Sequence, residues 1–225
     1  MKEVIIDSVC FQKKLEEFLK RVNGNNVLIS KVKEDGKIYL SIQDTYHKIT
    51  NSCDSMLFGL MYSIYYGLDK LERNDGKFLK IIEKYANLLH DLKINKKDFG
   101  SVLRDIHDVS GCWHVAFASK LVATQDPNLP VIDRNVRKIF GIKDIYIKES
   151  SEKSNEEIIE YWCRVHKELL KAYEELDKTI VIENKSINDI YRKNWPELMA
   201  MTTTKRIDHL AWEIRKYEIR EHVEL

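Results

Sequence analysis

Basic side chains gather on one face of a short predicted helix in the middle of the chain. Arg134, Arg137 and Lys138 stand at positions i, i+3 and i+4, which places them side by side on a helix. Guanidinium and ammonium groups arranged in this way can hold the phosphates of a nucleic acid. In a chain of which 32% is charged, the same spacing is equally typical of an ordinary solvated surface, and both interpretations stay open.

A second basic group, Lys96, Lys97 and Arg104, precedes this helix and would extend a phosphate-binding footprint. The net charge of the whole chain does not indicate a nucleic-acid partner, since 37 Lys and Arg against 36 Asp and Glu leave a formal net charge of +1. No overall field therefore attracts a polyanion, and any contact with nucleic acid must come from a local patch.

Trp113 and His114 open an unusually apolar predicted helix and have side chains suited to a ligand. The charge of a histidine changes near neutral pH, so His114 can hydrogen-bond a base, a phosphate or Asp133. The Trp113 ring can stack on an extruded base. Each residue more often has a structural role. A histidine on a buried helix is usually hydrogen-bonded within the protein, and a tryptophan there usually packs in the core.

No metal site or cofactor is expected. His107, Asp108, Cys112 and His114 lie close together in the sequence, but their spacing matches no standard ligand pattern. The four cysteines of the chain are far apart and form no CxxC pair, which is typical of reduced thiols.

The chain carries no segment that predicts export or a membrane span. Acids and lysines interrupt the N-terminus where a signal peptide needs an apolar core. The longest mostly apolar stretch, residues 55–68, is too short to cross a bilayer. These features predict a cytoplasmic protein without a membrane partner.

Helices must position most of these residues, because apolar side chains recur at helical spacing from residue 52 onward. An amphipathic N-terminal helix is also expected, ending at Asn23-Gly24. The C-terminal helix carries an apolar stripe that should pack against the first helices. The predicted helices are residues 8–22, 52–68, 75–91, 97–107, 112–124, 133–140, 153–175, 186–193 and 203–222.

One segment predicts β-structure instead. Two β-rich runs meet at Asp35-Gly36, a dipeptide that suits a tight turn, so a hairpin is expected over residues 27–42. Residues 1–50 would then form an appendage of a helix and a hairpin, and residues 51–225 a helical domain. Residues 148–157 are expected to be an exposed loop leading into a helix, with Ser154 and Glu157 as its capping box.

Asp133 follows a loop that contains two prolines and stands at the start of a predicted helix. Prolines make such a loop rigid, and aspartate is a favoured N-cap. The simplest interpretation is that Asp133 caps the helix of residues 133–140.

The order of elements over residues 97–142 resembles the core of the helix-hairpin-helix DNA glycosylases, and the match centres on VIDRNV at residues 131–136. Ala116 also stands where that superfamily usually has a small residue on its buried helix. The resemblance implies a mainly α-helical glycosylase-type fold. The family hairpin, which binds DNA phosphate, usually reads Pro-Gly-hydrophobic-Gly. This chain has VSGC at residues 109–112 instead, with one glycine in place of two. The resemblance implies that Ser110 and Gly111 contact DNA phosphate.

The resemblance makes Asp133 the catalytic residue, which stabilises positive charge on the sugar as the N-glycosidic bond breaks. Aligning on Asp133 and Ala116 puts His114 where bifunctional members have a lysine. Lys120, six residues further along, points about 240° around the helix from His114. The resemblance therefore implies a monofunctional enzyme in which water attacks the sugar.

The expected partner is double-stranded DNA with a base flipped out of the helix. The base can be oxidised, alkylated or a hypermodified base of phage DNA, in repair or in defence, and nothing in the residues selects among them. One alternative is a non-catalytic module that keeps the fold and binds DNA or a protein. Another is an all-α protein unrelated to DNA.

Overall fold

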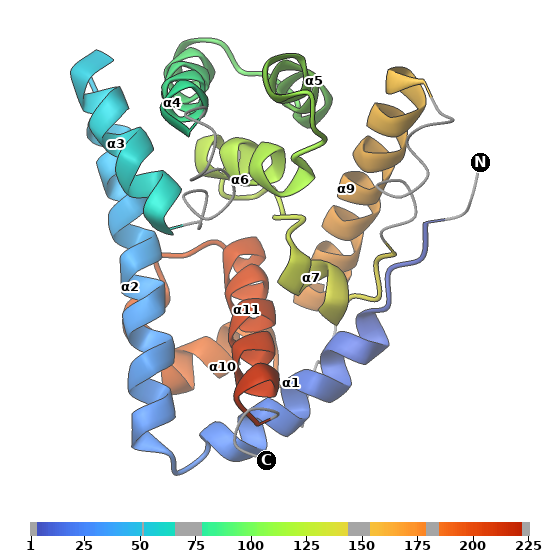
Figure 1. The fold of residues 1–225 in the computed structure, drawn as a ribbon. Helices are drawn as coiled ribbons and strands as arrows, with labels where there is room; N and C mark the ends of the chain where they lie inside the picture. The colour runs from blue at the N-terminus through green and yellow to red at the C-terminus, as the bar shows by residue number, and fades with distance from the viewer. Residues whose placement is uncertain (1–3, 51, 66–77, 144–153, 179–184, 222–225) are drawn as a thin grey trace.

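The computed structural model describes residues 4–50, 52–65, 78–143, 154–178 and 185–221. Within these ranges the chain is mainly helical and contains no β-strand, which confirms the expected all-α class (Figure 1). The helices are α1 (Ser8–Val22), α2 (Asn26–Lys48), α3 (Ser52–Tyr65), α4 (Phe78–Ile94), α5 (Phe99–Ser110), α6 (Val115–Gln125), α7 (Arg134–Ile139), α9 (Asn155–Lys178), α10 (Ile187–Asn194), the 3₁₀ turn η3 (Pro196–Leu198) and α11 (Thr203–Glu221).

The prediction of a hairpin over residues 27–42 is wrong, because α2 runs unbroken through Asp35 and Gly36. Gly36 is buried in the middle of the helix, where a Cβ atom would lie 2.4 Å from Leu198 Cδ1. The glycine therefore allows α2 and η3 to approach closely and makes no turn. Buried Val32, Gly36 and Gln43 follow a helical period, which the β-rich composition of this segment had concealed.

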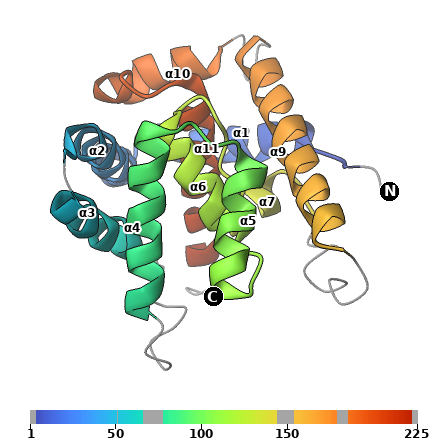
Figure 2. The same cartoon turned by 90° about the horizontal axis from the view of Figure 1, so that it is seen from above.

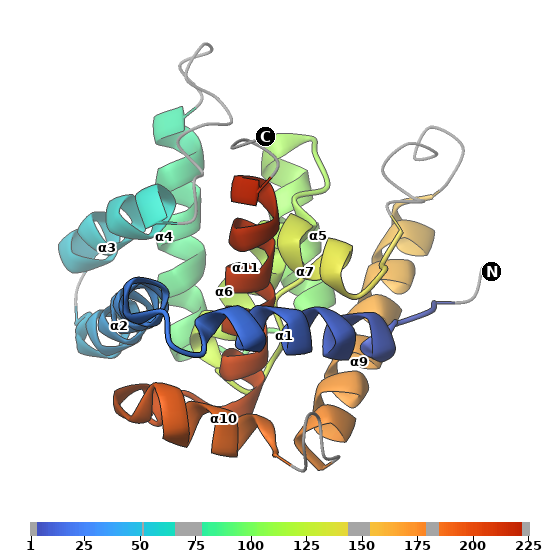
Figure 3. The same ribbon diagram turned by 90° about the horizontal axis from the view of Figure 1, so that it is seen from below.

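Helix α1 has the bounds that the sequence predicted, and it packs against α11 across the base of the molecule (Figure 3). Asp7 caps its start by accepting a hydrogen bond from Cys10 N. Its buried stripe meets the C-terminal helix, where Phe18 and Tyr217 form an edge-on ring pair. The prediction that the last helix packs on the first is confirmed.

Helix α11 lies between α2 on one side and α7 and α9 on the other (Figures 1 and 2). It contacts α1, α7, α9 and α10. Its apolar stripe is buried, and so are the polar side chains of Asp208 and Glu213 on the same helix. Buried carboxylates need hydrogen-bonding partners. The elements that supply these partners are therefore held against α11.

Helices α5 and α6 pack against each other and are joined by a short turn. Asp98 caps the start of α5, and Gly111 ends it in the left-handed conformation with φ of 69°. Of the eleven residues of α6, only Ala116 and Gln125 are not buried. The predicted order of helix, short connection and central apolar helix is confirmed, while the glycosylase fold itself stays a prediction.

Residues of the first fifty share one hydrophobic core with the rest of the chain, Phe11 and Tyr46 among them. The capping box of α9 is confirmed, because the Ser154 and Glu157 side chains each accept a hydrogen bond from the other residue's backbone N–H. Most of the loop expected over residues 148–157 lies outside the described residues. No helix in the described ranges has the length and apolar character needed to span a membrane.

Candidate active site

Asp133 is the N-cap of α7, as the sequence predicted, and is 4% exposed. Its Oδ1 accepts hydrogen bonds from Asn135 N and Val136 N, both at 2.9 Å. Its Oδ2 accepts one from Trp212 Nε1 of α11, 79 residues further along the chain. One oxygen thus caps the helix, and the other faces Trp212 and α6, so the capping and catalytic interpretations are compatible.

The side chain of Lys120 approaches that second oxygen. Its Nζ lies 3.9 Å from Asp133 Oδ2 and 5.3 Å from the centre of the Trp212 ring, and the residue is 5% exposed. Burial lowers the pKa of the Lys120 ammonium, and the negative charge of Asp133 acts in the opposite direction. The arrangement is a desolvated amine beside a carboxylate, which is a setting in which lysine acts as a nucleophile.

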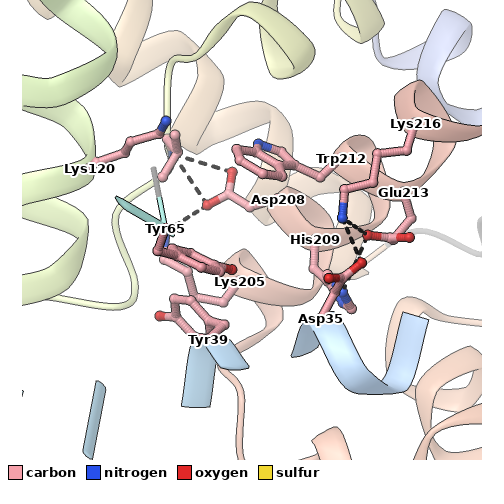
Figure 4. A pocket seen from close by; sticks show the side chains of 11 residues that line it. Asp35, Tyr39, Tyr65, Lys120, Lys205, Asp208, His209, Trp212, Glu213 and Lys216 are labelled. Atoms are coloured by element: carbon pink, nitrogen blue, oxygen red, sulfur yellow. Dashed lines mark hydrogen bonds and ion pairs between the residues drawn. The ribbon is translucent and has the colours of Figure 1, made fainter. Parts of the chain in front are cut away.

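A narrow pocket opens beside this pair, where α2, α3, α6 and α11 meet (Figure 4). The space enclosed within it is small, about 50 Å³, and the volume rises to about 490 Å³ only when the open mouth is included. Aromatic rings and ionisable groups share its wall. The lining residues are Asp35, Tyr39, Tyr65, Lys120, Val131, Lys205, Asp208, His209, Trp212, Glu213 and Lys216.

A buried ion pair on α11 holds the loop that carries Asp133. Lys205 Nζ donates to Asp208 Oδ2 at 2.6 Å and to the Leu129 carbonyl at 2.7 Å. The Asp208 carboxylate accepts from Val131 N at 3.2 Å and from the Tyr173 hydroxyl at 2.9 Å. Because every partner is buried or half-buried, this network fixes the backbone two residues before Asp133.

Three further contacts hold the same loop from three directions. They are Thr202 Oγ1 to the Pro127 carbonyl, His166 Nε2 to the Pro130 carbonyl at 3.1 Å, and Ile132 N to Ser119 Oγ at 2.9 Å. Burial lowers the pKa of His166 to about 4, so its ring is neutral at pH 7. The carbonyl can only accept, and Nε2 therefore carries the proton. The position of Asp133 thus depends on α6, α9 and α11 together.

A second ionic group closes the other end of the pocket (Figure 4). Lys216 Nζ contacts Asp35 Oδ2 at 2.6 Å and Glu213 Oε1 at 2.8 Å. Burial raises the pKa of Glu213, and burial lowers the pKa of the neighbouring His209 to about 4. These ion pairs connect α2 with α11, because Asp35 belongs to α2 and both Glu213 and Lys216 belong to α11.

Trp113 and His114 lie at the start of α6 and are not among the residues that line the pocket. The Trp113 ring stacks on His107 with centroids 3.8 Å apart. His114 is the N-cap residue of α6, but its side chain makes no capping hydrogen bond, and its ring lies 5.5 Å from that of Phe117. The structure therefore puts both side chains in the connection between α5 and α6.

Ser110 and Gly111 form that same connection. The Ser110 hydroxyl bonds the Ile106 carbonyl at 2.8 Å, and Cys112 N donates to Ser110 Oγ at 3.2 Å. A Cβ atom on Gly111 would meet nothing within 4 Å, so the left-handed backbone conformation is what requires glycine there.

Two of the predicted phosphate-binding residues have acidic partners, Lys97 just before α5 and Arg104 within it. Lys97 Nζ lies 2.8 Å from Asp105 Oδ2, and Arg104 lies 2.9 Å from Glu156 of α9. Both pairs are at least partly exposed, so a phosphate can compete with these carboxylates at little cost. Their geometry fits a surface ion pair as well as a nucleic-acid contact.

The basic residues of α7 divide into two kinds. Arg134 and Lys138 are exposed one turn apart. Arg137 is half-buried, donates from Nε to the Asp133 carbonyl at 3.3 Å, and lies 5.9 Å from the Trp162 ring centre. Arg134 and Lys138 are therefore the pair available to a phosphate, while Arg137 packs against the protein.

The resemblance set Lys120 aside, because it points away from His114 on the helix, and the sequence identified neither Trp212 nor Asp208. A local signal existed for Lys120, since it is the one charged residue within α6, a helix otherwise buried among apolar groups. The other two stand on the last helix, 75 or more residues from Asp133. No local pattern could connect them to that residue.

Comparison with protein-family models, with curated proteins and with solved structures finds no match to this chain. The geometry of the chain itself and the motif at residues 131–136 are therefore what indicate a function.

Proposed function

We propose that the protein is a DNA glycosylase that cleaves the N-glycosidic bond of a damaged or modified base. The observation that carries this proposal is the Lys120 amine, buried 3.9 Å from the Asp133 carboxylate at the edge of a pocket with aromatic walls. Such a pocket suits a base flipped out of double-stranded DNA, because aromatic rings stack on its faces.

Asp133 has the role of stabilising the positive charge that develops on the sugar as the base leaves. The sequence led to water as the attacking group, because His114 cannot form a Schiff base. The position of Lys120 supplies the desolvated amine that this inference lacked. We therefore propose Lys120 as the nucleophile. Its unprotonated nitrogen bonds to C1′ as the bond to the base breaks, and an N–H proton passes to the departing base. The C1′–O4′ bond then opens, with O4′ taking a proton from solvent, and a protonated Schiff base results. Loss of a C2′ proton from this Schiff base breaks the C3′–O bond and releases the 3′ phosphate.

The test uses a panel of oligonucleotides with oxidised, alkylated or hypermodified bases, together with phage genomic DNA. Each is incubated with the protein under borohydride, and strand breaks are compared before and after alkali. The expected result is a covalent adduct that Lys120→Gln lacks. Abasic sites that break only after alkali, without an adduct, would instead establish hydrolysis by water. If no substrate yields an abasic site, the proposed activity is wrong.

The exposed basic pair on α7 predicts the salt dependence of DNA binding. Replacing Arg134 and Lys138 together by alanine should lower the slope of log affinity against log salt by about 0.9 for each lost phosphate contact. Fluorescence anisotropy with labelled duplex at several salt concentrations measures the slope. Arg137→Ala is the matched control, because its packing on Trp162 predicts lower stability and an unchanged slope. An unchanged slope in the double variant would assign both residues to solvated surface.

A non-catalytic DNA-binding module is the second candidate. It is favoured by the engagement of both Asp133 oxygens, since one caps α7 and the other accepts from Trp212. This candidate predicts salt-dependent binding without abasic sites, whereas an all-α protein unrelated to DNA predicts neither.

A further inference from the structure

The charges that line the pocket beside Lys120 are paired with one another. Three lysines and three carboxylates contribute to the wall, and Lys120 has Asp133 beside it. The remaining contacts join Lys205 with Asp208, and Lys216 with Asp35 and Glu213. A charged ligand would lose its hydration without gaining a counter-charge, unless it broke one of these pairs. The wall therefore favours a ligand without net charge.

Two polar groups of this wall lack a hydrogen-bond partner among the described residues, namely His209 Nε2 and the Tyr39 hydroxyl. The Tyr39 hydroxyl is neutral. It is buried and has no hydrogen-bond partner among the described residues. Burial raises the pKa of Tyr39, so the hydroxyl keeps its proton at neutral pH. A buried hydroxyl without a partner is costly, and a ligand that hydrogen-bonds it removes that cost.

Gln43 adds a second observation one helical turn along α2. It is 9% exposed, and neither its Oε1 nor its Nε2 has a hydrogen-bond partner in the described part of the chain. Residues four apart share a helix face, so Gln43 follows Tyr39 on the side of α2 that faces the interior. This face thus presents one hydroxyl in the pocket wall and, outside the wall, one carboxamide without a hydrogen-bond partner among the described residues.

The remaining walls are flat and aromatic. Tyr39, Tyr65 and Trp212 contribute rings from α2, α3 and α11 (Figure 4). Rings of this kind stack on a planar heterocycle, while a hydroxyl at the edge bonds its polar atoms.

We infer that the pocket accepts an uncharged heterocyclic base, whose polar edge hydrogen-bonds the Tyr39 hydroxyl, and excludes bases with a fixed positive charge. This inference deepens the proposed function, on which its biological meaning rests. It assigns the substrate to neutral oxidised or otherwise modified bases and excludes cationic alkylated ones.

Two nucleosides of identical composition test the charge requirement without DNA. N6-methyladenosine is neutral at pH 7, whereas its isomer 1-methyladenosine is a cation. Binding to the full chain is measured by calorimetry and by protein NMR. We expect the neutral isomer to bind at least about tenfold more tightly, an energetic difference of about 1.4 kcal/mol. O6-methylguanosine and the cationic 7-methylguanosine at pH 6 form a second pair that changes the shape. Equal or tighter binding of the cations, or no binding of any of the four, overturns the inference.

Tyr39→Phe tests the hydroxyl itself. Since that group lacks a partner in the structure, its removal should leave urea stability unchanged or higher and weaken the neutral nucleoside about fivefold. Tyr161→Phe is the control, because it removes a hydroxyl that bonds the Lys143 carbonyl outside the pocket, and it should leave nucleoside binding unchanged. Unchanged binding by Tyr39→Phe overturns the role of Tyr39.

These assays separate the inference from the proposed function. Nucleoside binding requires neither DNA nor bond cleavage. Neutral selectivity in a protein that leaves no abasic sites would support the pocket assignment and reject the glycosylase. Excision of a cationic base would do the reverse.

Discussion

Asp133→Asn is expected to abolish base excision, with a loss of about a thousandfold or more in rate. The amide cannot supply the negative charge that the developing sugar cation needs, and it removes the charge 3.9 Å from the Lys120 amine. The fold should persist, since asparagine also caps helices well. The substitution places an amide NH₂ against the Trp212 N–H, so a modest cost of about 1–3 kcal/mol is expected in the free energy of unfolding.

Single-turnover excision assays and urea denaturation measure the two effects. Asp98→Asn is the matched control, because it makes the same change at the N-cap of α5, where Asp98 accepts from Ser101 N. It should retain excision. An active Asp133→Asn protein would remove Asp133 from the mechanism and leave it only a helix cap.

Asp208→Ala is expected to cause the largest loss of stability, about 3–5 kcal/mol. The change leaves the buried Lys205 ammonium without its carboxylate and takes the acceptor from Val131 N and the Tyr173 hydroxyl. Since whole domains are stable by only about 5–15 kcal/mol, the variant should be partly unfolded at 37 °C. The loop before Asp133 should loosen first.

Urea denaturation measures the stability of this variant, and hydrogen exchange of the Val131 amide reports on the loop. Asp44→Ala is the control, because Asp44 forms an exposed pair with Lys48 whose loss should cost under about 1 kcal/mol. Equal losses in both variants would show that the Asp208 network contributes little to the fold.

Local patterns predicted nearly every helix. Predicted and observed bounds agree for α1, and they differ by a few residues for α5, α6, α7 and α10, because apolar spacing and capping residues act within one or two turns. The prediction of a hairpin was wrong because it, too, depended on local signals alone. Val, Ile and Gly around residue 36 favour strand and turn locally, but the packing of α2 on η3 selects the helix.

The sequence by itself determined where the helices run and that Asp133 begins one of them, since capping is a contact between residues two and three apart. Only the tertiary structure decided what surrounds that carboxylate. Lys120 comes from the preceding helix and Trp212 from the last one, and Tyr39 lies on a segment whose local signal predicted a strand. These residues meet because burying the apolar faces of α2, α6 and α11 also brings their polar side chains together, and burial is a property of the whole chain.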